Sequence, residues 1–287
     1  MAQEERTSSK LIGKLQGISR GVAAPIGFGR YPAQPLPAML LLASLPRNEA
    51  ALAEAAVTTG ADALVGYLHE GQGDARFGGI SEERSNLQAV LKVAGDRPVG
   101  VAIGGNGAIT ADELRDLAGM GVDFVAVAPH RAPAALLRLE EVGHVARLDG
   151  DHPGGLLRGL NELNVDAVQL TLGRPDGSLA QLTIHDLASL RQLLDAVRRP
   201  ILLPTAWAAQ PADLAFLRDL GVEGLVLTRE LLGDRPEDVR ARVAEYRQAV
   251  DKLGPPVGRG RALGGRRVVL PRVTVRPEAE EEDDEED

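Results

Sequence analysis

Two histidines and one glutamate stand where they could share a catalytic site. His69, His130 and Glu230 each lie just beyond a short apolar run. Histidine titrates near neutral pH, so this set could supply a general acid and a general base. Two histidines and one carboxylate could equally hold a divalent metal ion. The third alternative is a hydrogen-bonded polar plug, and the sequence leaves all three open.

The register of the apolar runs predicts that these three side chains converge. Side chains alternate across a strand, and an acidic residue opens four of the runs, which gives a common reference point. These residues are Asp62, Asp123, Asp166 and Glu223. Counting forward predicts three interior layers of a barrel: Val65, Ala126, Gln169 and Val226; Tyr67, Ala128, Thr171 and Thr228; and His69, His130, Gly173 and Glu230. Arg147 and Asp149, in the fifth run, are expected beside the last layer.

Eight apolar runs alternate with helix-period segments between residues 38 and 253. The runs cover residues 38–44, 61–68, 99–103, 123–128, 144–148, 166–172, 200–205 and 223–228. Helix-start signals follow several of them, among them Asn48, Pro236 and the capping-box pair Thr110 and Glu113. Eight strands with eight helical intervals predict an α/β fold, a single (β/α)8 TIM barrel.

A weak internal repeat supports the barrel. The segment RPVGVAIGGNGAITADELRDLAGMGVDFVAVA, from Arg97, aligns with RPILLPTAWAAQPADLAFLRDLGVEGLVLT, from Arg199, at an offset of 102 residues. The third and fourth runs therefore match the seventh and eighth, as two joined half-barrels would produce. This symmetry favours a closed barrel over an open sheet.

The doubled half-barrel and the entries GVDFVAVA, GVEGLVLT and VDAVQL resemble the phosphate-binding barrels. That superfamily includes the histidine-biosynthesis isomerase and cyclase and phosphoribosylanthranilate isomerase. The resemblance implies phosphate-binding Gly-rich loops after the third and seventh strands, and an acidic residue ending the first and fifth. The third run does end in Gly104, Gly105, Asn106 and Gly107, and the fifth in Asp149. The first run ends in Ser44 and the seventh continues into PTAWAAQ, so the sequence departs from the pattern there.

The Gly-rich turn from Gly104 to Gly107 is a candidate anion site. Backbone N–H groups in a turn that opens a helix can bind an anion. Arg131 or Arg76 could pair with it. The alternative is a plain tight turn, since the expected capping box already uses some of those N–H groups.

Two longer loops are expected on the same face of the barrel. They are HEGQGDARFGGIS, with Arg76, and GRPDGSLAQLT, with Arg174. Their arginines could bind an anionic substrate together with Gln169 and Thr171, and their glycines would permit closure over it. Ordinary surface loops with solvated arginines are the alternative.

Composition excludes several classes of chemistry. The 287 residues contain no cysteine, which rules out disulfides, thiolate nucleophiles and Cys-ligated metals. No lysine falls at the end of an apolar run, so a Schiff-base mechanism is not expected. No apolar run is long enough for a membrane span and no leader is recognisable, so we expect a cytoplasmic protein without a membrane partner.

The charge is concentrated at the C-terminus. Residues 278–287, EAEEEDDEED, hold nine acidic residues, which account for the net charge of −9. Residues 254–277 are Arg-rich. The expected organisation is an N-terminal extension (1–37), the barrel (38–253), the Arg-rich extension (254–277) and a disordered acidic tail (278–287). A protein partner could bind this C-terminus, whereas nucleic acid is not expected beside so many acids.

Two functions remain open at this point. The first is an isomerase or lyase that acts on a small phosphorylated or carboxylated metabolite by acid–base or metal-assisted chemistry. The second is a catalytically silent barrel that works as a scaffold through its terminal extensions. The cofactor is unknown; a divalent metal fits the first function, and a flavin is less favoured because glycine pairs are missing after the seventh and eighth runs.

Overall fold

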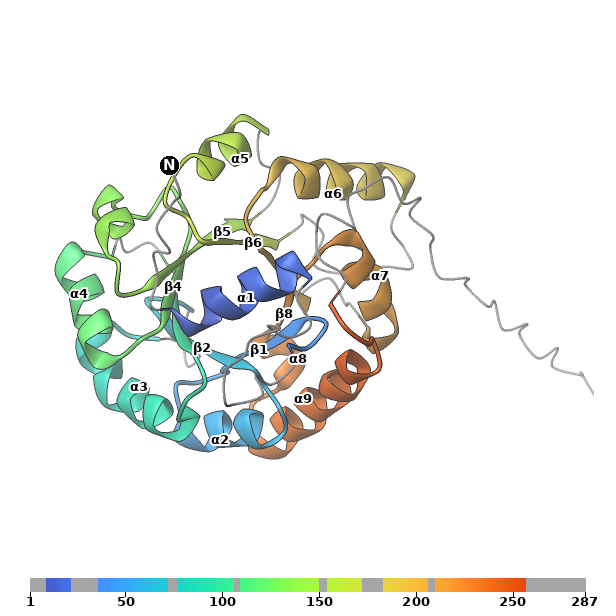
Figure 1. The fold of residues 1–287 in the computed structure, drawn as a ribbon. Coiled ribbons are helices and arrows are strands. Elements are labelled where there is room, and N and C mark those ends of the chain that lie inside the picture. The colour runs from blue at the N-terminus through green and yellow to red at the C-terminus, as the bar shows by residue number, and fades with distance from the viewer. Residues whose placement is uncertain are drawn as a thin grey trace, which may run out of the picture.

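Eight parallel strands close into a barrel in the computed structural model, each paired with its neighbours in chain order (Figure 1). The structure describes residues 9–21, 36–71, 77–105, 109–149, 154–171, 183–205 and 210–256. The strands are β1 (Leu40–Ser44), β2 (Ala63–Leu68), β3 (Val99–Ile103), β4 (Phe124–Val127), β5 (Gly143–Asp149), β6 (Ala167–Thr171), β7 (Ile201–Pro204) and β8 (Gly224–Leu227). The predicted (β/α)8 barrel is confirmed.

Helices surround the barrel in the order expected for βα units (Figure 1). They are α2 (Ala50–Thr58), α3 (Ile80–Ala94), α4 (Ala111–Met120), α5 (Gly154–Asn161), α6 (Ile184–Ala196), α7 (Leu214–Leu220), α8 (Arg229–Leu232) and α9 (Pro236–Asp251), with the 3-10 turns η2 (Ala134–Arg138) and η5 (Pro211–Asp213). The interval between β4 and β5 differs from the prediction, because η2 stands where a full α-helix was expected. Pro133 stands just before η2 and β5 begins at Gly143, so the segment between them has little room for a longer helix.

The interior and exterior of the barrel follow the predicted register. Val65, Tyr67, Ala126 and Val226 are buried together inside the barrel. Their strand neighbours, such as Leu64 and Leu225, pack outward against the helices. Strand alternation therefore holds over the middle of each strand, where both faces are buried.

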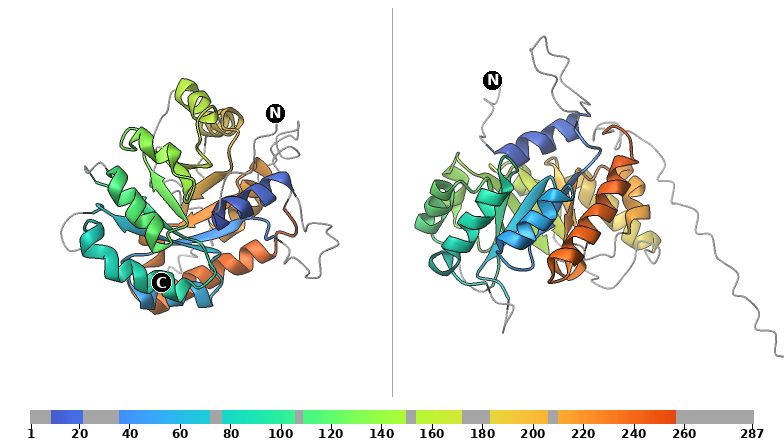
Figure 2. Two further views of the ribbon diagram at one scale, coloured as in Figure 1. Left: turned by 60° about the vertical axis from the view of Figure 1, so that its left-hand side comes forward. Right: turned by 90° about the horizontal axis from the view of Figure 1, so that it is seen from below.

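A further helix, α1 (Lys10–Arg20), lies across the amino-terminal end of the barrel (Figure 2). Its buried residues Leu11, Ile12, Leu15 and Ile18 form one apolar stripe and join the interior cluster. Gly143, the first residue of β5, has no space for a side chain because Ile12 lies against it. Since α1 closes this end, access to the barrel interior remains at the carboxyl ends of the strands.

The acidic residues that open the even strands explain where α1 docks. Asp62, Asp166 and Glu223 each accept a hydrogen bond from a backbone N–H at the start of the preceding odd strand. Asp123 instead accepts bonds from the backbone N–H groups of Lys10 and Leu11, at 2.7 and 3.0 Å. It thereby satisfies donors that the first turn of α1 leaves unpaired.

Replacing Asp123 with alanine should loosen α1. The free energy of unfolding should fall by about 2 kcal/mol, because charge-assisted hydrogen bonds to the helix start are lost. Urea denaturation measures the change. The control is Asp96→Ala, whose fully exposed carboxylate lies 3.8 Å from Lys10 Nζ. Equal losses in both variants would contradict this role of Asp123.

No helix within the described ranges is long and apolar enough to cross a membrane. The expected acidic tail, 278–287, lies outside the described residues, as does all of 254–277 except its first three residues. The proposed boundaries of the terminal extensions therefore stay predictions.

Candidate active site at the carboxyl ends of the strands

One carboxylate lies between two guanidinium groups at the mouth of the barrel. Glu70 Oε2 is 3.2 Å from Arg147 Nη1, and Glu70 Oε1 is 3.1 Å from Arg229 Nη2. The side chains of Glu70, Arg147 and Arg229 are only 18%, 17% and 22% exposed. Two guanidinium groups therefore flank one carboxylate in a partly buried place, and guanidinium groups carry the donors that phosphate and carboxylate accept.

Two aromatic rings support Arg229. Its guanidinium carbon lies 4.6 Å from the ring centre of Tyr67 and 5.4 Å from that of Phe77, and the two ring centres are 5.2 Å apart. These contacts hold the guanidinium group over the aromatic faces. Burial raises the pKa of Tyr67, so its hydroxyl keeps its proton near neutral pH and can donate a hydrogen bond.

The trio is assembled from three distant parts of the chain. Arg147 occupies an interior position of β5, Arg229 is the first residue of α8, and Glu70 follows β2 by two residues. The side chain of Glu70 lies against Gly104, where any Cβ would collide with it. The glycine that follows β3 therefore makes room for the carboxylate.

His69 pairs with a glutamate from the next βα unit. Its Nε2 lies 3.5 Å from Glu113 Oε1, and its backbone has a φ of 55°, an unusual value for a residue other than glycine. Glu113 belongs to the predicted capping box, which is present: its Oε2 accepts from the backbone N–H and the hydroxyl of Thr110, both at 2.9 Å. The Thr110 backbone bond lowers the pKa of Glu113, so the carboxylate stays ionised and can orient the imidazole.

Asn48 fixes the end of β2, the strand that leads to this site. Its Nδ2 donates to the Tyr67 carbonyl at 2.8 Å, and the Tyr67 backbone N–H donates to its Oδ1 at 3.0 Å. Nδ2 also donates to Glu83 at 3.0 Å, and Glu83 accepts from Gly78 in the same loop as Phe77. Asn48 thus joins the segment after β1 to the end of β2. The sequence suggested instead that Asn48 starts a helix, but the N-cap of α2 is Glu49.

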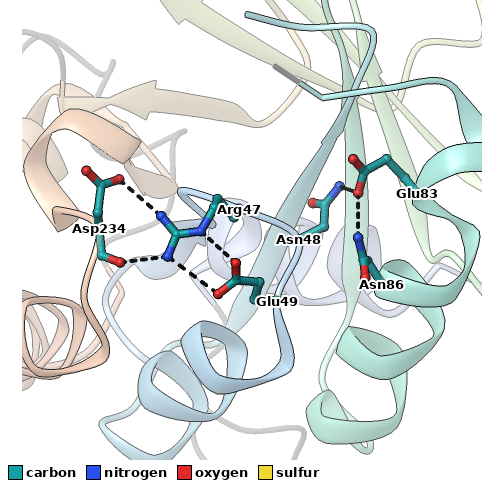
Figure 3. A network of polar contacts seen from close by, with 6 residues as sticks. All are labelled: Arg47, Asn48, Glu49, Glu83, Asn86 and Asp234. Atoms are coloured by element: carbon teal, nitrogen blue, oxygen red, sulfur yellow. Dashed lines mark hydrogen bonds and ion pairs between the residues drawn. The ribbon is translucent and has the colours of Figure 1, made fainter. Parts of the chain in front are cut away.

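A second set of contacts joins the loop after β1 to the segment after α8 (Figure 3). Arg47 Nε lies 2.6 Å from Glu49, and Arg47 Nη1 lies 3.8 Å from Asp234. These side chains are about half exposed or more. The contacts therefore link neighbouring loops but contribute little to the free energy of unfolding.

The predicted anion site at the Gly-rich turn is partly occupied by the chain itself. The N–H of Gly104 donates to the Leu68 carbonyl at 3.0 Å, so it is not available to an anion. The carbonyl of Gly105, whose φ is 65°, accepts from Arg131, whose Nε also contacts His130 Nε2 at 3.1 Å. Arg131 therefore binds the turn and its own neighbour in this structure.

Four predicted site residues lie outside the described part of the chain: Asn106, Gly107, Arg76 and Arg174. The side chain of Asp149 is also not described, although its backbone pairs in register with Thr171. Strand alternation places Gln169 and Thr171 inside the barrel, where both are half-buried beside the strand that carries Arg147.

The predicted convergence of His69, His130 and Glu230 is not formed. His130 is exposed, and the side chain of Glu230 is 74% exposed, 4.0 Å from Arg229. No group of three or more His, Asp or Glu residues in the described ranges is placed to hold a metal ion. The register prediction fails here because β2 ends at Leu68 and β8 at Leu227, so alternation no longer governs the next residues.

The residues that the sequence interpretation missed are Glu70, Arg229 and Glu113. The left-handed backbone of His69 turns that ring toward α4 and brings Glu70 to the mouth. The start of α8 turns Arg229 inward and Glu230 outward. The sequence left open that Arg229 turns the carboxylate of Glu230 outward, because the side chains of two consecutive residues face opposite sides of a strand.

Comparisons with known proteins agree on the fold. The sequence matches no protein-family model and no curated protein. A thiamine phosphate pyrophosphorylase from Pyrococcus furiosus matches with a TM-score of 0.53 and 16% identity, over 76% of this chain and 97% of that one. A tryptophan synthase structure from M. tuberculosis matches with a TM-score of 0.59 and 14% identity, over 84% of this chain and 97% of that one. KGPDC from Streptococcus mutans matches with a TM-score of 0.54 and 10% identity, over 75% of this chain and 98% of that one.

At these identities the likeness extends to the fold and not to the activity. The barrel is shared with these enzymes. The finer resemblance to the histidine-biosynthesis barrels stays a prediction.

Proposed function

We propose that this barrel is an enzyme that acts on a small phosphorylated or carboxylated metabolite at the carboxyl ends of its strands. The observation that carries the proposal is the arrangement of Arg147 and Arg229 around Glu70. Active sites of (β/α)8 enzymes lie at this end of the barrel. The similar structures include an enzyme named for a phosphate compound, thiamine phosphate, which fits an anionic substrate.

In this proposal the two arginines bind the anionic group of the substrate. Guanidinium groups suit phosphate and carboxylate because they donate paired hydrogen bonds to two oxygens. Glu70 occupies the place of that anion while the site is free, so the substrate exchanges one carboxylate partner for another. The Tyr67 ring beneath Arg229 keeps that guanidinium group in place.

Proton transfer is assigned to His69. Its imidazole is partly exposed on the same loop as Glu70, and the ionised Glu113 keeps it oriented. A histidine beside a fixed carboxylate can take a proton from a substrate and return it, as an isomerase or lyase requires. Among the described residues, no two histidines and one carboxylate lie close enough together to bind a divalent metal ion. We therefore assign no metal-assisted step.

A silent scaffold barrel is the second candidate. The observation in its favour is that Glu70 already pairs with both arginines, as a polar plug would. The two candidates differ in whether an added anion displaces Glu70.

Thermal unfolding in the presence of anions tests the enzyme proposal. Millimolar phosphate, and then a panel of small phosphorylated and carboxylated metabolites, should raise the melting temperature at constant ionic strength. Arg147→Gln or Arg229→Gln should weaken binding by about tenfold or more, because a charge-assisted bond is lost. Arg84→Gln, which breaks an exposed pair with Asp116, is the control and should bind normally. If anions raise the melting temperature equally in all variants, or do not raise that of the wild type, the scaffold is favoured.

A metabolite found in that screen then tests His69. His69→Gln should lower kcat by about 100-fold or more while the dissociation constant stays within about threefold, because the imidazole acts on protons rather than on affinity. Unchanged turnover in this variant would remove His69 from the reaction.

A further inference from the structure

A second hollow lies on the outer side of the barrel wall, away from the mouth. It is bounded by β4, β5, η2 and α5, where the short η2 replaces a full helix and leaves the strands partly uncovered. Its volume is about 220 Å³. Its lining includes Val127, Leu136, His144, Leu160, Leu163 and Val165.

His144 is the one polar side chain among the described residues that line this pocket. It is 4% exposed, and its Nδ1 lies 2.9 Å from the backbone oxygen of Asn164. A carbonyl oxygen only accepts hydrogen bonds, so Nδ1 carries the proton of the neutral ring. The other nitrogen, Nε2, is then a lone-pair acceptor.

Nε2 of His144 is buried and has no hydrogen-bond partner within the described part of the chain. Such a buried acceptor is unfavourable and is uncommon in folded proteins. The nearby carboxylate of Asp166 lies on the Nδ1 side, 3.9 Å from that nitrogen, and its Oδ2 accepts the backbone N–H of His144. Because Nε2 is covered by its neighbours, a ligand must part the side chains around it to reach this acceptor, and it must then supply one hydrogen-bond donor.

We propose that this pocket binds a small uncharged molecule with an apolar ring or alkyl body and one hydroxyl or N–H group. The body packs against the leucine and valine side chains, and the donor bonds to Nε2 of His144. The apolar lining excludes a charged ligand, since nothing in it compensates the loss of hydration. This site is independent of the function proposed for the barrel mouth.

Phenol and toluene form a matched pair of probes, since they differ by a hydroxyl in place of a methyl group. Their dissociation constants are measured by titration calorimetry on the full chain, and on His144→Leu. The ratio of the toluene constant to the phenol constant should fall by about tenfold in His144→Leu, because that variant keeps an apolar side chain and loses the acceptor. His185→Leu, at an exposed position of α6, is the control and should keep the wild-type ratio.

An unchanged ratio in His144→Leu would overturn the proposal, and so would the failure of both probes to bind at millimolar concentration. If His144→Leu does not fold, the imidazole nitrogen resonances of the wild-type protein decide. Phenol should then shift the Nε2 signal of His144 clearly more than toluene does. Equal shifts with both probes would overturn the proposal.

Discussion

Replacing Leu15 with aspartate should detach α1 from the barrel and lower the free energy of unfolding by about 4 kcal/mol. Leu15 is fully buried in the cluster that the apolar stripe of α1 forms with the interior of the barrel. The change removes about 2 to 3 kcal/mol of apolar burial and would place an unpaired carboxylate in an apolar site. The helix avoids that placement by leaving the barrel.

Urea denaturation measures this loss, and amide exchange of α1 shows whether the helix has detached. Ile184→Asp is the matched control, because Ile184 is 88% exposed. Its stability should stay within about 0.5 kcal/mol of wild type. A similar loss in both variants, or full amide protection of α1 in Leu15→Asp, would show that α1 does not close the barrel.

Replacing Glu70 with glutamine should lower stability by about 2 kcal/mol and tighten phosphate binding by about tenfold. The change keeps the shape of the side chain and removes the only carboxylate shown between Arg147 and Arg229 in the described residues. Two partly buried guanidinium groups then lose their shared counterion, which destabilises the fold. The same loss removes the competitor for an incoming anion.

Urea titrations in chloride and in phosphate, at equal ionic strength, separate these effects. Phosphate should restore most of the stability lost in Glu70→Gln. Glu49→Gln is the control, since its exposed pair with Arg47 should contribute less than about 1 kcal/mol. If Glu70→Gln is destabilised and phosphate restores nothing, the trio is a structural plug.

The sequence predicted the barrel because its signals are repeated and local. Each strand is a short apolar run between turn signals, and the half-barrel repeat favoured a closed barrel over an open sheet. Capping at Thr110 and Glu113 was readable because it depends on two residues three positions apart. The interior layer that holds Val65, Ala126 and Val226 was predicted because alternation is strict where a strand is buried on both sides.

The composition of the mouth was predicted only in part, because it depends on residues just beyond the strands. Arg147 was expected there and lies in β5, inside the regular register. Glu70 and Arg229 were missed, because a left-handed residue precedes one and a helix begins at the other. Their pairing joins positions 159 residues apart, and no local pattern reports such a contact.

The central claim is that Arg147 and Arg229 form the anion site of this barrel. A crystal structure of the full chain in millimolar phosphate tests it most directly. The account predicts a phosphate whose oxygens lie about 2.7 to 2.9 Å from both guanidinium groups, with Glu70 displaced from at least one of them. A phosphate found only at the turn from Gly104 to Asn106, or none at the barrel mouth while Glu70 keeps both arginines, would contradict it.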